Sequence, residues 1–231
     1  MKSNTKKELR TEKAVEFKTE NKNYLALDTS GSHLAAIAVK AGVAHSVFLP
    51  DCAMKHSVSL IPAIDEALKK ADLRLEECDF FAAVVGAGSF TGIRIGISAI
   101  KGFCLAFQKP SLPVTSFDIA AYNAVDGPKG KILCLVDALH DAYYACGYEN
   151  GEVALAPAYL TEEEVLALAA QGYKLTAFAP LPISEKAEVT LTDPVVGLQN
   201  AVKALSEKGA FAPLDALYVR KSSAEINKGQ V

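Results

Sequence analysis

The stretch that decides the fold is an eleven-residue segment in the first half of the chain, Gly86-Ala87-Gly88-Ser89-Phe90-Thr91-Gly92-Ile93-Arg94-Ile95-Gly96. An apolar run over residues 80–85 precedes it, and its length and branched side chains are typical of a buried strand. Apolar residues then recur every three or four positions, which indicates a helix: Ile93, Ile97, Ile100, Cys104 and Phe107. The glycines therefore occupy a strand-to-helix turn, where backbone N–H groups can face an anion or another backbone.

The spacing excludes three common uses of such a turn. A phosphate-binding P-loop requires Gly-Lys-Ser/Thr, whereas Gly92 is followed by Ile93 and Arg94. A dinucleotide fingerprint requires a third glycine where Thr91 stands. A nucleophile elbow requires a glycine where Ala87 stands. On these residues alone, a purely structural turn that packs a helix closely on its strand is as well supported as a turn with a binding function.

An aspartate ends the first predicted strand, over residues 24–28, and the side chains of Asp28 and Ser30 could also cap a turn. Two further strands, 33–40 and 43–49, are expected to form a hairpin.

The same order returns in the second half. An apolar strand over 131–138 contains Asp137, and a hairpin follows over 141–148 and 153–156. We interpret the recurrence as an internal duplication of one structural half. Two unrelated hairpins in an α/β protein are the alternative.

Amphipathic patterns predict helices over 55–70, 92–107, 117–125, 161–171 and 195–207. Ser116 is expected to cap the third of these. A short strand or turn over 113–116 and a strand over 173–179 are expected, with a loop over 180–193. The Gly- and Pro-containing stretch 126–130 is the predicted boundary between two lobes.

Composition places the chain among globular proteins with a sizeable core, since half of its 231 residues are hydrophobic. No apolar run approaches a membrane span and no signal peptide is visible, so we expect a soluble, cytoplasmic protein. The five scattered cysteines argue against a disulfide framework or a cysteine zinc site. Residues 1–23 mix seven Lys or Arg with four Glu, which favours a solvated extension over a nucleic-acid-binding arm.

The glycine-rich segment resembles the signature of the bacterial TsaB (YeaZ) family, Gly-Pro-Gly-Ser-Phe-Thr-Gly-Leu-Arg-Ile-Gly. Residues 25–30 and 213–220, with a Pro-x-Tyr-x-Arg tail, also resemble that family. The resemblance implies an α/β fold of the actin-like, RNase H-like type (ASKHA) with two lobes, the second of them reduced. The expected division is a flexible extension over 1–23, lobes over 24–128 and 129–221, and a tail over 222–231.

The resemblance also implies a function. The chain would be a non-catalytic scaffold in the formation of threonylcarbamoyladenosine (t6A) in tRNA, paired with a catalytic TsaD-type paralogue and a TsaE-type ATPase. It would reach tRNA only through that complex and would form a homodimer when alone. No cofactor is required, although ATP or ADP could bind at the interface of the complex.

The catalytic paralogues carry a His-x-x-x-His metal pair on the helix that here begins near His56, but Leu60 occupies the second position. We therefore expect no catalytic or metal-binding residue, and a surface or capping role for His56. The expected partner interface consists of His56, Leu60, Ile61, Ile64, Leu68, Gly92, Ile93, Gly96, Ile100 and Phe103. The expected signature loop consists of Gly86, Gly88, Ser89, Phe90, Thr91, Gly92 and Arg94. The residues that could face a nucleotide are Asp28, Thr29, Ser30 and Asp137.

Two enzymatic readings stay open as alternatives, an actin-like small-molecule kinase and a homologue of M22-type peptidases. The single glycine signature weighs against a kinase, and the missing second histidine weighs against a peptidase. A direct RNA-binding module is disfavoured because the sequence shows no basic stripe or aromatic platform.

Overall fold

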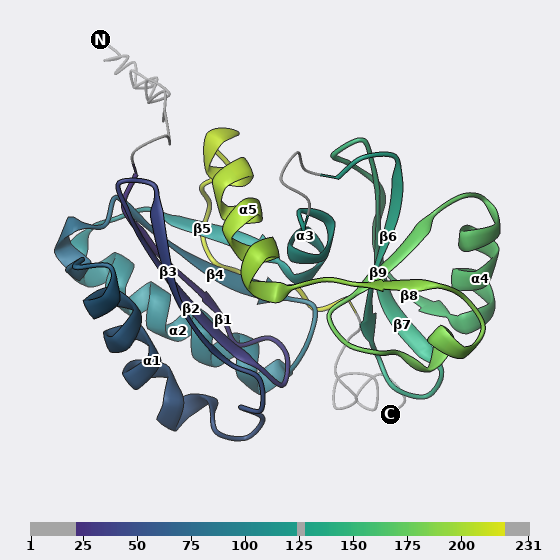
Figure 1. Ribbon diagram of the computed structural model, residues 1–231, viewed down its shortest axis with the longest axis horizontal. Coiled ribbons are helices and arrows are strands. Elements are labelled where there is room, and N and C mark those ends of the chain that lie inside the picture. The colour runs from purple at the N-terminus through teal and green to yellow at the C-terminus, as the bar shows by residue number, and fades with distance from the viewer. Residues whose placement is uncertain (1–21, 124–127, 220–231) are drawn as a thin grey trace, which may run out of the picture.

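A computed structural model describes residues 22–123 and 128–219 of the chain (Figure 1). The predicted tail over 222–231, nearly all of the predicted extension, and residues 126–127 of the predicted boundary lie outside the described residues. The first half contains β1 (Tyr24–Asp28), β2 (Leu34–Lys40), β3 (Val43–Leu49), α1 (His56–Lys70), the 3-10 turn η1 (Leu75–Glu77), β4 (Phe80–Gly86), α2 (Phe90–Phe107), β5 (Ser111–Thr115) and α3 (Ser116–Ala121). The second half contains β6 (Lys131–Asp137), β7 (Ala142–Glu149), β8 (Glu152–Thr161), α4 (Glu162–Ala170), β9 (Lys174–Ala177), the 3-10 turn η2 (Pro182–Glu185), β10 (Val189–Leu191) and α5 (Pro194–Glu207).

The two halves build five-stranded mixed sheets with the same topology. In the first sheet the order is β3-β2-β1-β4-β5, and in the second it is β8-β7-β6-β9-β10. In each sheet the hairpin strands pair antiparallel and the last two strands join in parallel. This arrangement confirms the predicted α/β fold class and the repeated order of strands. The reduction of the second half lies in its helices, because η2 stands where the first half has α2.

The elements stack in five layers, which can be followed from left to right in Figure 1. Helices α1 and α2 cover one face of the first sheet, and α3 and α5 cover the other. The second sheet comes next, with Cys134 and Cys146 facing the same core cluster as α3 and α5. Helix α4 and η2 close its far side around Val165 and Ile183. One continuous apolar cluster thus joins the two sheets.

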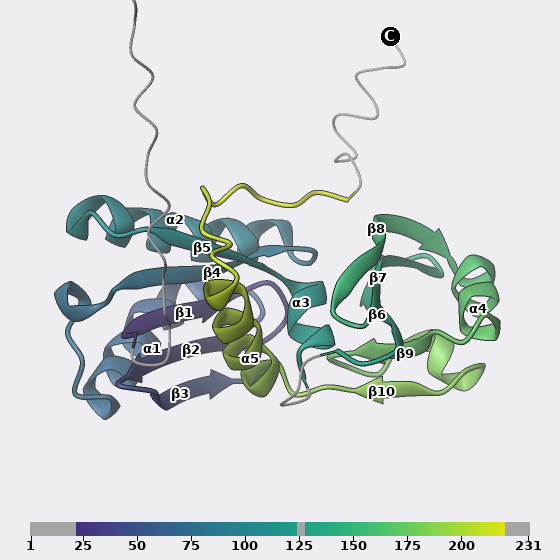
Figure 2. The ribbon, with the colours of Figure 1, turned by 90° about the horizontal axis from the view of Figure 1, so that it is seen from above.

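The last part of the chain returns to the first sheet. Helix α5 packs on α3 and β5, and residues 209–219, here called the C-terminal strap, run along the edge of β5 and the end of β4 (Figure 2). Ala212 N donates to Ser111 O at 3.1 Å, and Leu217 N donates to Val85 O at 2.7 Å. The predicted second lobe, 129–221, therefore extends too far, because α5 and the C-terminal strap pack on the first half.

Several local expectations differ from the structure. Thr115, and not Ser116, caps α3, because Thr115 and Asp118 form a reciprocal capping box. The Ser116 hydroxyl instead donates to Ala87 O at 2.6 Å. Strand β8 is longer than its apolar core suggested, and the predicted loop over 180–193 contains β10 and η2. The short elements β10 and η2 depend on neighbouring segments that sequence periodicity does not reveal.

Helix α2 is the described segment that bears on the expectation that no apolar run approaches a membrane span. Its 18 residues have a mean hydropathy of 1.4, enough by length and composition alone. Core helices of soluble proteins meet the same criterion. Here the side of α2 that carries Ile93, Ile97 and Ile100 is buried against the first sheet.

Candidate functional site

The glycine-rich turn lies against the end of β1. Gly88 has a φ of +147°, and a Cβ there would lie 2.3 Å from Ser30 O. A Cβ on Gly92 would lie 2.0 Å from Thr29 O. Ser89 N donates to Ser30 O at 2.7 Å, and the Ser89 side chain caps α2 by accepting from Gly92 N. The glycines are therefore needed because two backbone segments meet here without space for side chains.

Thr29 fixes the other side of this contact. Its hydroxyl donates to Gly92 O at 2.7 Å. A Cβ added to Gly96 would lie only 2.6 Å from the oxygen of the same hydroxyl. Gly92 and Gly96 thus accommodate the chain's own first strand. This corrects the prediction that both glycines admit a partner helix.

Asp28 is sealed beneath the turn, and both of its carboxylate oxygens are engaged. Oδ1 accepts from Ser30 N at 2.8 Å and from the Ser30 hydroxyl at 2.7 Å. Oδ2 lies 2.9 Å from Nε2 of His33. Burial by itself would raise the pKa of Asp28, but the hydrogen bonds and the charge of His33, with the Ser30 bonds, hold that pKa below its usual value.

His33 is the partner of Asp28 that the sequence analysis missed. Its ring packs 5.6 Å from Phe48 of β3 and edge-on, 6.2 Å, to Phe178 just after β9, so it touches both halves. Burial would lower the pKa of His33, but the hydrogen bond and charge of Asp28 outweigh it and raise that pKa. The sequence did contain a signal for this pair, because the turn at Gly31 and Ser32 lies between Asp28 and His33 and can bring them together.

His56 is buried, which corrects its predicted place at the surface or at a helix cap. Its Nε2 donates to the backbone oxygen of His33 at 2.9 Å. Leu60, one turn later, is also buried in the core cluster beneath α1. His56 therefore supports the turn that carries His33.

A cavity of about 740 Å³ lies at the junction of the two halves, beside this network. Ser30 and Asp137, two of the predicted nucleotide-facing residues, line it from opposite halves. Asp28 and Thr29 are buried behind its wall, which corrects their predicted exposure to a ligand. Asp137 Oδ1 accepts from Leu139 N at 2.8 Å. The other lining residues are Gly31, Ser32, His33, Phe48, Pro50, Ala53, Met54, His56, Ser57, Gly88, Ser89, Thr91, Gly92, Ile95, Leu135, Val136, Ala177, Phe178, Ala179, Leu181 and Pro194.

The actin-like fold implies a nucleotide at this junction, and the residues present do not fit one. Phosphate sites balance charge with Lys, Arg or a metal held by carboxylates, or bind through backbone N–H groups at a helix N-terminus. At the start of α2, the N–H groups of Ser89 and Gly92 are already bonded to Ser30 O and to the Ser89 hydroxyl. Among the described residues that line the cavity there is no Lys or Arg. Asp137 brings negative charge, and the carboxylate of Asp28 is already bound by Ser30 and His33. The cavity of this chain therefore lacks the charges that a triphosphate needs.

Most of the predicted partner interface is covered by the chain itself. Leu60, Ile64, Ile93 and Ile100 are buried, as are His56, Gly92 and Gly96. Ile61 is 59% exposed, and Leu68 and Phe103 are partly buried. The prediction underestimated how completely two helices side by side cover one face of a five-stranded sheet. Other apolar residues are exposed on the same helices instead, among them Val58, Phe90 and Leu105.

Two signature residues meet the C-terminal strap at the start of α2. Nε of Arg94 donates to the hydroxyl of Tyr218 at 2.9 Å, and its guanidinium lies 3.8 Å from the ring centroid of Phe90. The rings of Phe90 and Tyr218 stack at 5.3 Å. The sequence placed Arg94 and Tyr218 in two separate motifs, and only the return of the chain brings them together.

Comparison with known proteins gives a family for this geometry. The family model described as TsaD, tRNA N6-adenosine threonylcarbamoyltransferase, matches residues 43–216. A TsaB protein of Buchnera aphidicola from Schizaphis graminum is 32% identical over 115 residues, 49% of this chain and 54% of that protein. The Escherichia coli TsaB protein is 26% identical over 129 residues, 55% of each chain. A tRNA N6-adenosine threonylcarbamoyltransferase of Staphylococcus epidermidis is 33% identical over 112 residues, 42% of this chain and 33% of that protein.

The matched region spans about half the length of these TsaB relatives and a third of the transferase. Among solved structures, a Pseudomonas aeruginosa protein described as similar to the peptidase YEAZ has a TM-score of 0.73 at 24% identity, over 86% of this chain and 100% of that chain. YeaZ from the same species has a TM-score of 0.68 at 21% identity, over 85% and 99%. These two structures share the fold. The family match over most of its length shows that this chain belongs to the TsaD family, within which its named relatives and its signature place it among the TsaB (YeaZ) proteins.

Proposed function

We propose that this chain is a non-catalytic subunit of the machinery that forms threonylcarbamoyladenosine in tRNA. It pairs with a catalytic paralogue of the TsaD type, a TsaE-type ATPase docks on the pair, and tRNA is reached only through that complex. The TsaB relatives support the process, since they are named for tRNA threonylcarbamoyladenosine biosynthesis.

The closed state of Asp28 is the observation that carries the non-catalytic role. A carboxylate with both oxygens held by Ser30 and His33 is committed to the protein's own structure. Leu60, at the position of the second metal-binding histidine of catalytic relatives, is sealed in the core. A kinase or a peptidase would keep the reactive groups at these two positions accessible to substrate. The bound Asp28 and the buried Leu60 therefore support a structural role for this part of the fold.

The proposal includes a nucleotide only at the interface between this chain and its partner. The cavity of the isolated chain does not match a triphosphate, and ATP or ADP at the contact with a partner stays a prediction. No step of the proposed role requires a nucleotide held by this chain.

Reconstitution with the TsaD-type and TsaE-type proteins of the same organism tests the proposal. Nucleoside mass spectrometry of tRNA incubated with threonine, bicarbonate and ATP, together with the enzyme that makes threonylcarbamoyl-adenylate, is the readout. We expect modification only when this chain and the paralogue are both present, and none with this chain as the sole TsaD-family protein.

Asp137→Asn separates a supporting role from an enzymatic one. If the chain is a scaffold, this change at the cavity should alter the rate by less than about threefold, like the control Asp51→Asn at an exposed loop. A loss of about a thousandfold for Asp137→Asn alone would instead identify an active carboxylate and overturn the proposal.

A further inference from the structure

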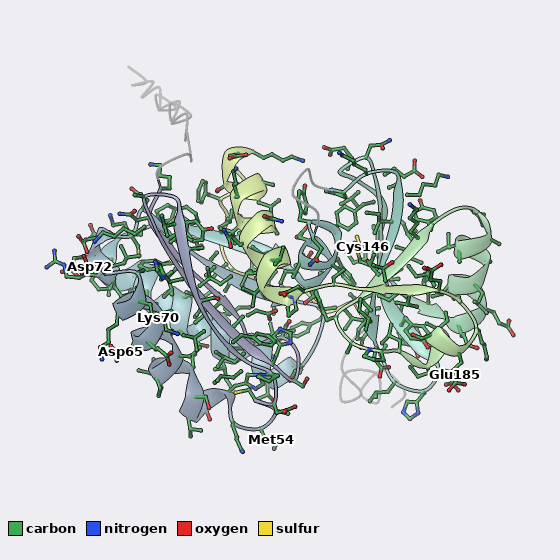
Figure 3. All side chains as sticks on the ribbon, in the orientation of Figure 1. Met54, Asp65, Lys70, Asp72, Cys146 and Glu185 are labelled. Atoms are coloured by element: carbon green, nitrogen blue, oxygen red, sulfur yellow. The ribbon has the colours of Figure 1, made fainter. Side chains whose placement is uncertain are left out.

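The cavity between the two halves has a largely apolar wall that includes two aromatic rings. Phe48 of β3 and Phe178, which follows β9, line it from opposite halves, and Ile95, Leu181 and Met54 add further apolar surface. Met54 is 98% exposed and lies on the loop before α1, at the lower end of the first half in Figure 3. A lining residue with that exposure stands at the opening of the cavity. A volume of about 740 Å³ is in the range of pockets that hold small organic molecules.

The charge that the lining residues bring to this cavity is negative. Asp137 is exposed, and its Oδ2 atom forms no hydrogen bond or ion pair with another described residue. The two histidines that line the cavity are both engaged within the chain. Nε2 of His33 lies 2.9 Å from the carboxylate of Asp28, which balances its charge, and Nε2 of His56 donates to the backbone oxygen of His33. One carboxylate therefore faces an apolar space without a cation beside it.

The turn after β6 holds this carboxylate in place. Oδ1 of Asp137 accepts from Leu139 N at 2.8 Å, which leaves Oδ2 free. Leu139, His140 and Asp141 follow one another with φ values of +63°, +55° and +55°. A left-handed run of residues other than glycine costs energy, and backbone strain of this kind clusters at binding sites. Because the carboxylate is already ordered, binding a cation there costs less conformational entropy.

We propose that this cavity binds a small organic cation with a flat apolar body, of the arylalkylamine class. The ammonium group of the ligand pairs with Oδ2 of Asp137. The ring of the ligand packs against Phe48 and Phe178, whose π faces also attract a cation. This site belongs to the chain by itself, and its occupation is separate from the role proposed above in tRNA modification.

The starts of two helices determine which way the ligand lies. Ser57 of α1, with Ser89 and Gly92 at the start of α2, lines the cavity from the first half, whereas Asp137 lines it from the second. The N-terminus of a helix carries partial positive charge and disfavours a cation. The ammonium group therefore lies on the side of Asp137. An anion held at the helix starts is the opposite assignment, and the two assignments differ in the charge that they select.

Three indole probes that share one aromatic body and differ in charge test the proposal. They are tryptamine, a cation, tryptophol, which is neutral, and indole-3-propionate, an anion. The chain contains no tryptophan, so indole fluorescence reports binding when each probe is titrated with the full chain. We expect affinity to fall in that order, with tryptamine about tenfold tighter than indole-3-propionate. ATP should not displace tryptamine.

Two substitutions, each with a matched control, connect the charge preference to the cavity. Asp137→Asn keeps the oxygen that accepts from Leu139 N and removes only the charge, so it should weaken tryptamine binding by about tenfold and tryptophol binding by less than about twofold. Asp141→Asn, in the same turn but outside the cavity lining, should stay within about twofold. Ala179→Lys adds a cation at an exposed lining position and should make indole-3-propionate the preferred probe. Ala154→Lys, at an exposed position of β8, should behave like the wild type.

Each other outcome overturns the proposal, once unfolding curves show that the compared variants are folded. Equal affinity for the three probes would mean an apolar pocket without charge selection. A preference for indole-3-propionate, or displacement of tryptamine by ATP, would identify an anion site at the helix starts. Tryptamine binding that neither Asp137→Asn nor Ala179→Lys changes would lie elsewhere on the chain. Absence of tryptamine binding up to about 10 mM would show that the cavity holds no such ligand. All of these measurements use the chain without tRNA or partners, so their result is independent of the proposed function.

Discussion

At the scale of single residues, the pair of Asp28 and His33 is tightly constrained, because burial and hydrogen bonds fix both side chains. The carboxylate is fully enclosed, and the imidazole touches side chains of both halves. A charged pair in such a place has lost its hydration, so each member depends on the other. The pair therefore links a local turn to the junction between the sheets.

Replacing Asp28 by Asn should lower the free energy of unfolding by about 3 kcal/mol near pH 6, because a buried charge loses its partner. The pKa of Asp28 is lowered, so its contribution is present above about pH 4 and is lost as pH falls through the lowered pKa. The pKa of His33 is raised, so its contribution is complete below about pH 6.5 and is lost as pH rises through the raised value.

Urea unfolding of the wild type and of Asp28→Asn from pH 4 to pH 9 checks this prediction. The wild type should lose stability above about pH 6.5, and the variant should lack that slope. Asp51→Asn, at an exposed loop, serves as the control and should follow the wild type. An identical pH profile for Asp28→Asn and the wild type would show that the pair does not contribute.

Two glycines of α2 give a matched comparison. Gly92→Ala places a Cβ 2.0 Å from a backbone oxygen that has no room to move, and should destabilise the fold by about 2 kcal/mol or more. Gly102→Ala meets nothing within 4 Å and should raise stability by up to about 1 kcal/mol, because alanine favours helix. Thermal unfolding of the two variants measures both effects. Equal melting temperatures would contradict the close approach of β1 to α2.

The candidate site could be predicted only where its residues are neighbours in sequence. The signature turn and the polar end of β1 were recognisable because strand periodicity and glycine spacing mark them. The partnership of Asp28 with His33 and that of Arg94 with Tyr218 depend on turns and on chain return. Exposure was the weakest inference, since periodicity identifies an apolar side of α1 but does not say what covers it.

At the scale of elements, α2 connects the site to the rest of the molecule. Its first turn borders the cavity, its inner side packs on β1 and β4, and its outer side meets the C-terminal strap. The strap has no regular secondary structure but buries Leu214 in the cluster beneath α1 and α2. It therefore acts as an additional packing element of the first half.

Leu214→Ala should reduce the free energy of unfolding by about 3 kcal/mol, the usual cost of truncating a buried leucine. Leu191→Ala, on the exposed edge strand β10, should change it by less than about 0.5 kcal/mol. Chemical denaturation followed by circular dichroism measures both values. A cost for Leu214→Ala as small as that of the control would show that the strap is not part of the core.

Most elements were predictable because their patterns are long and regular. The β1–β3 strands, α1, α2, β4, α4 and α5 match the expected ranges closely. Strand β10 and the 3-10 turns were not predictable, because a three- or four-residue element has too few positions to show a period. The position of α5 was missed for another reason: amphipathicity shows that a helix must be covered, and not by which sheet.

At the scale of the whole molecule, the five layers leave one broad side, that of α1 and α2, with exposed apolar residues. The prediction that the chain forms a homodimer when alone concerns this side. Ile64 is unsuitable for testing it because it is buried, and Asp there would unfold the protein. Ile61 is the appropriate residue, since it is exposed on α1.

We expect light scattering at micromolar concentration to show a dimer for the wild type and a monomer for Ile61→Asp. Val153→Asp, at an exposed position of β8 in the other half, should remain dimeric. Self-association through this side brings the exposed Arg94 and Lys101 of the two copies together. Because salt screens the repulsion between these like charges, added salt should strengthen the homodimer. A monomeric wild type, or a dimeric Ile61→Asp variant, would contradict the predicted interface.

The return of α5 to the first sheet has a consequence for synthesis of the protein. The side chain of Asn123, after α3, donates to Asp193 O at 2.6 Å and accepts from Asp193 N at 3.2 Å, so the chain leaves the first half and re-enters it at one point. The whole second sheet is thus encoded between two helices that pack on each other. Leu198 and Ala201 of α5 cover one face of the first sheet. During translation this face stays exposed until the second sheet, and then α5, have emerged from the ribosome. The half that is made first is completed last.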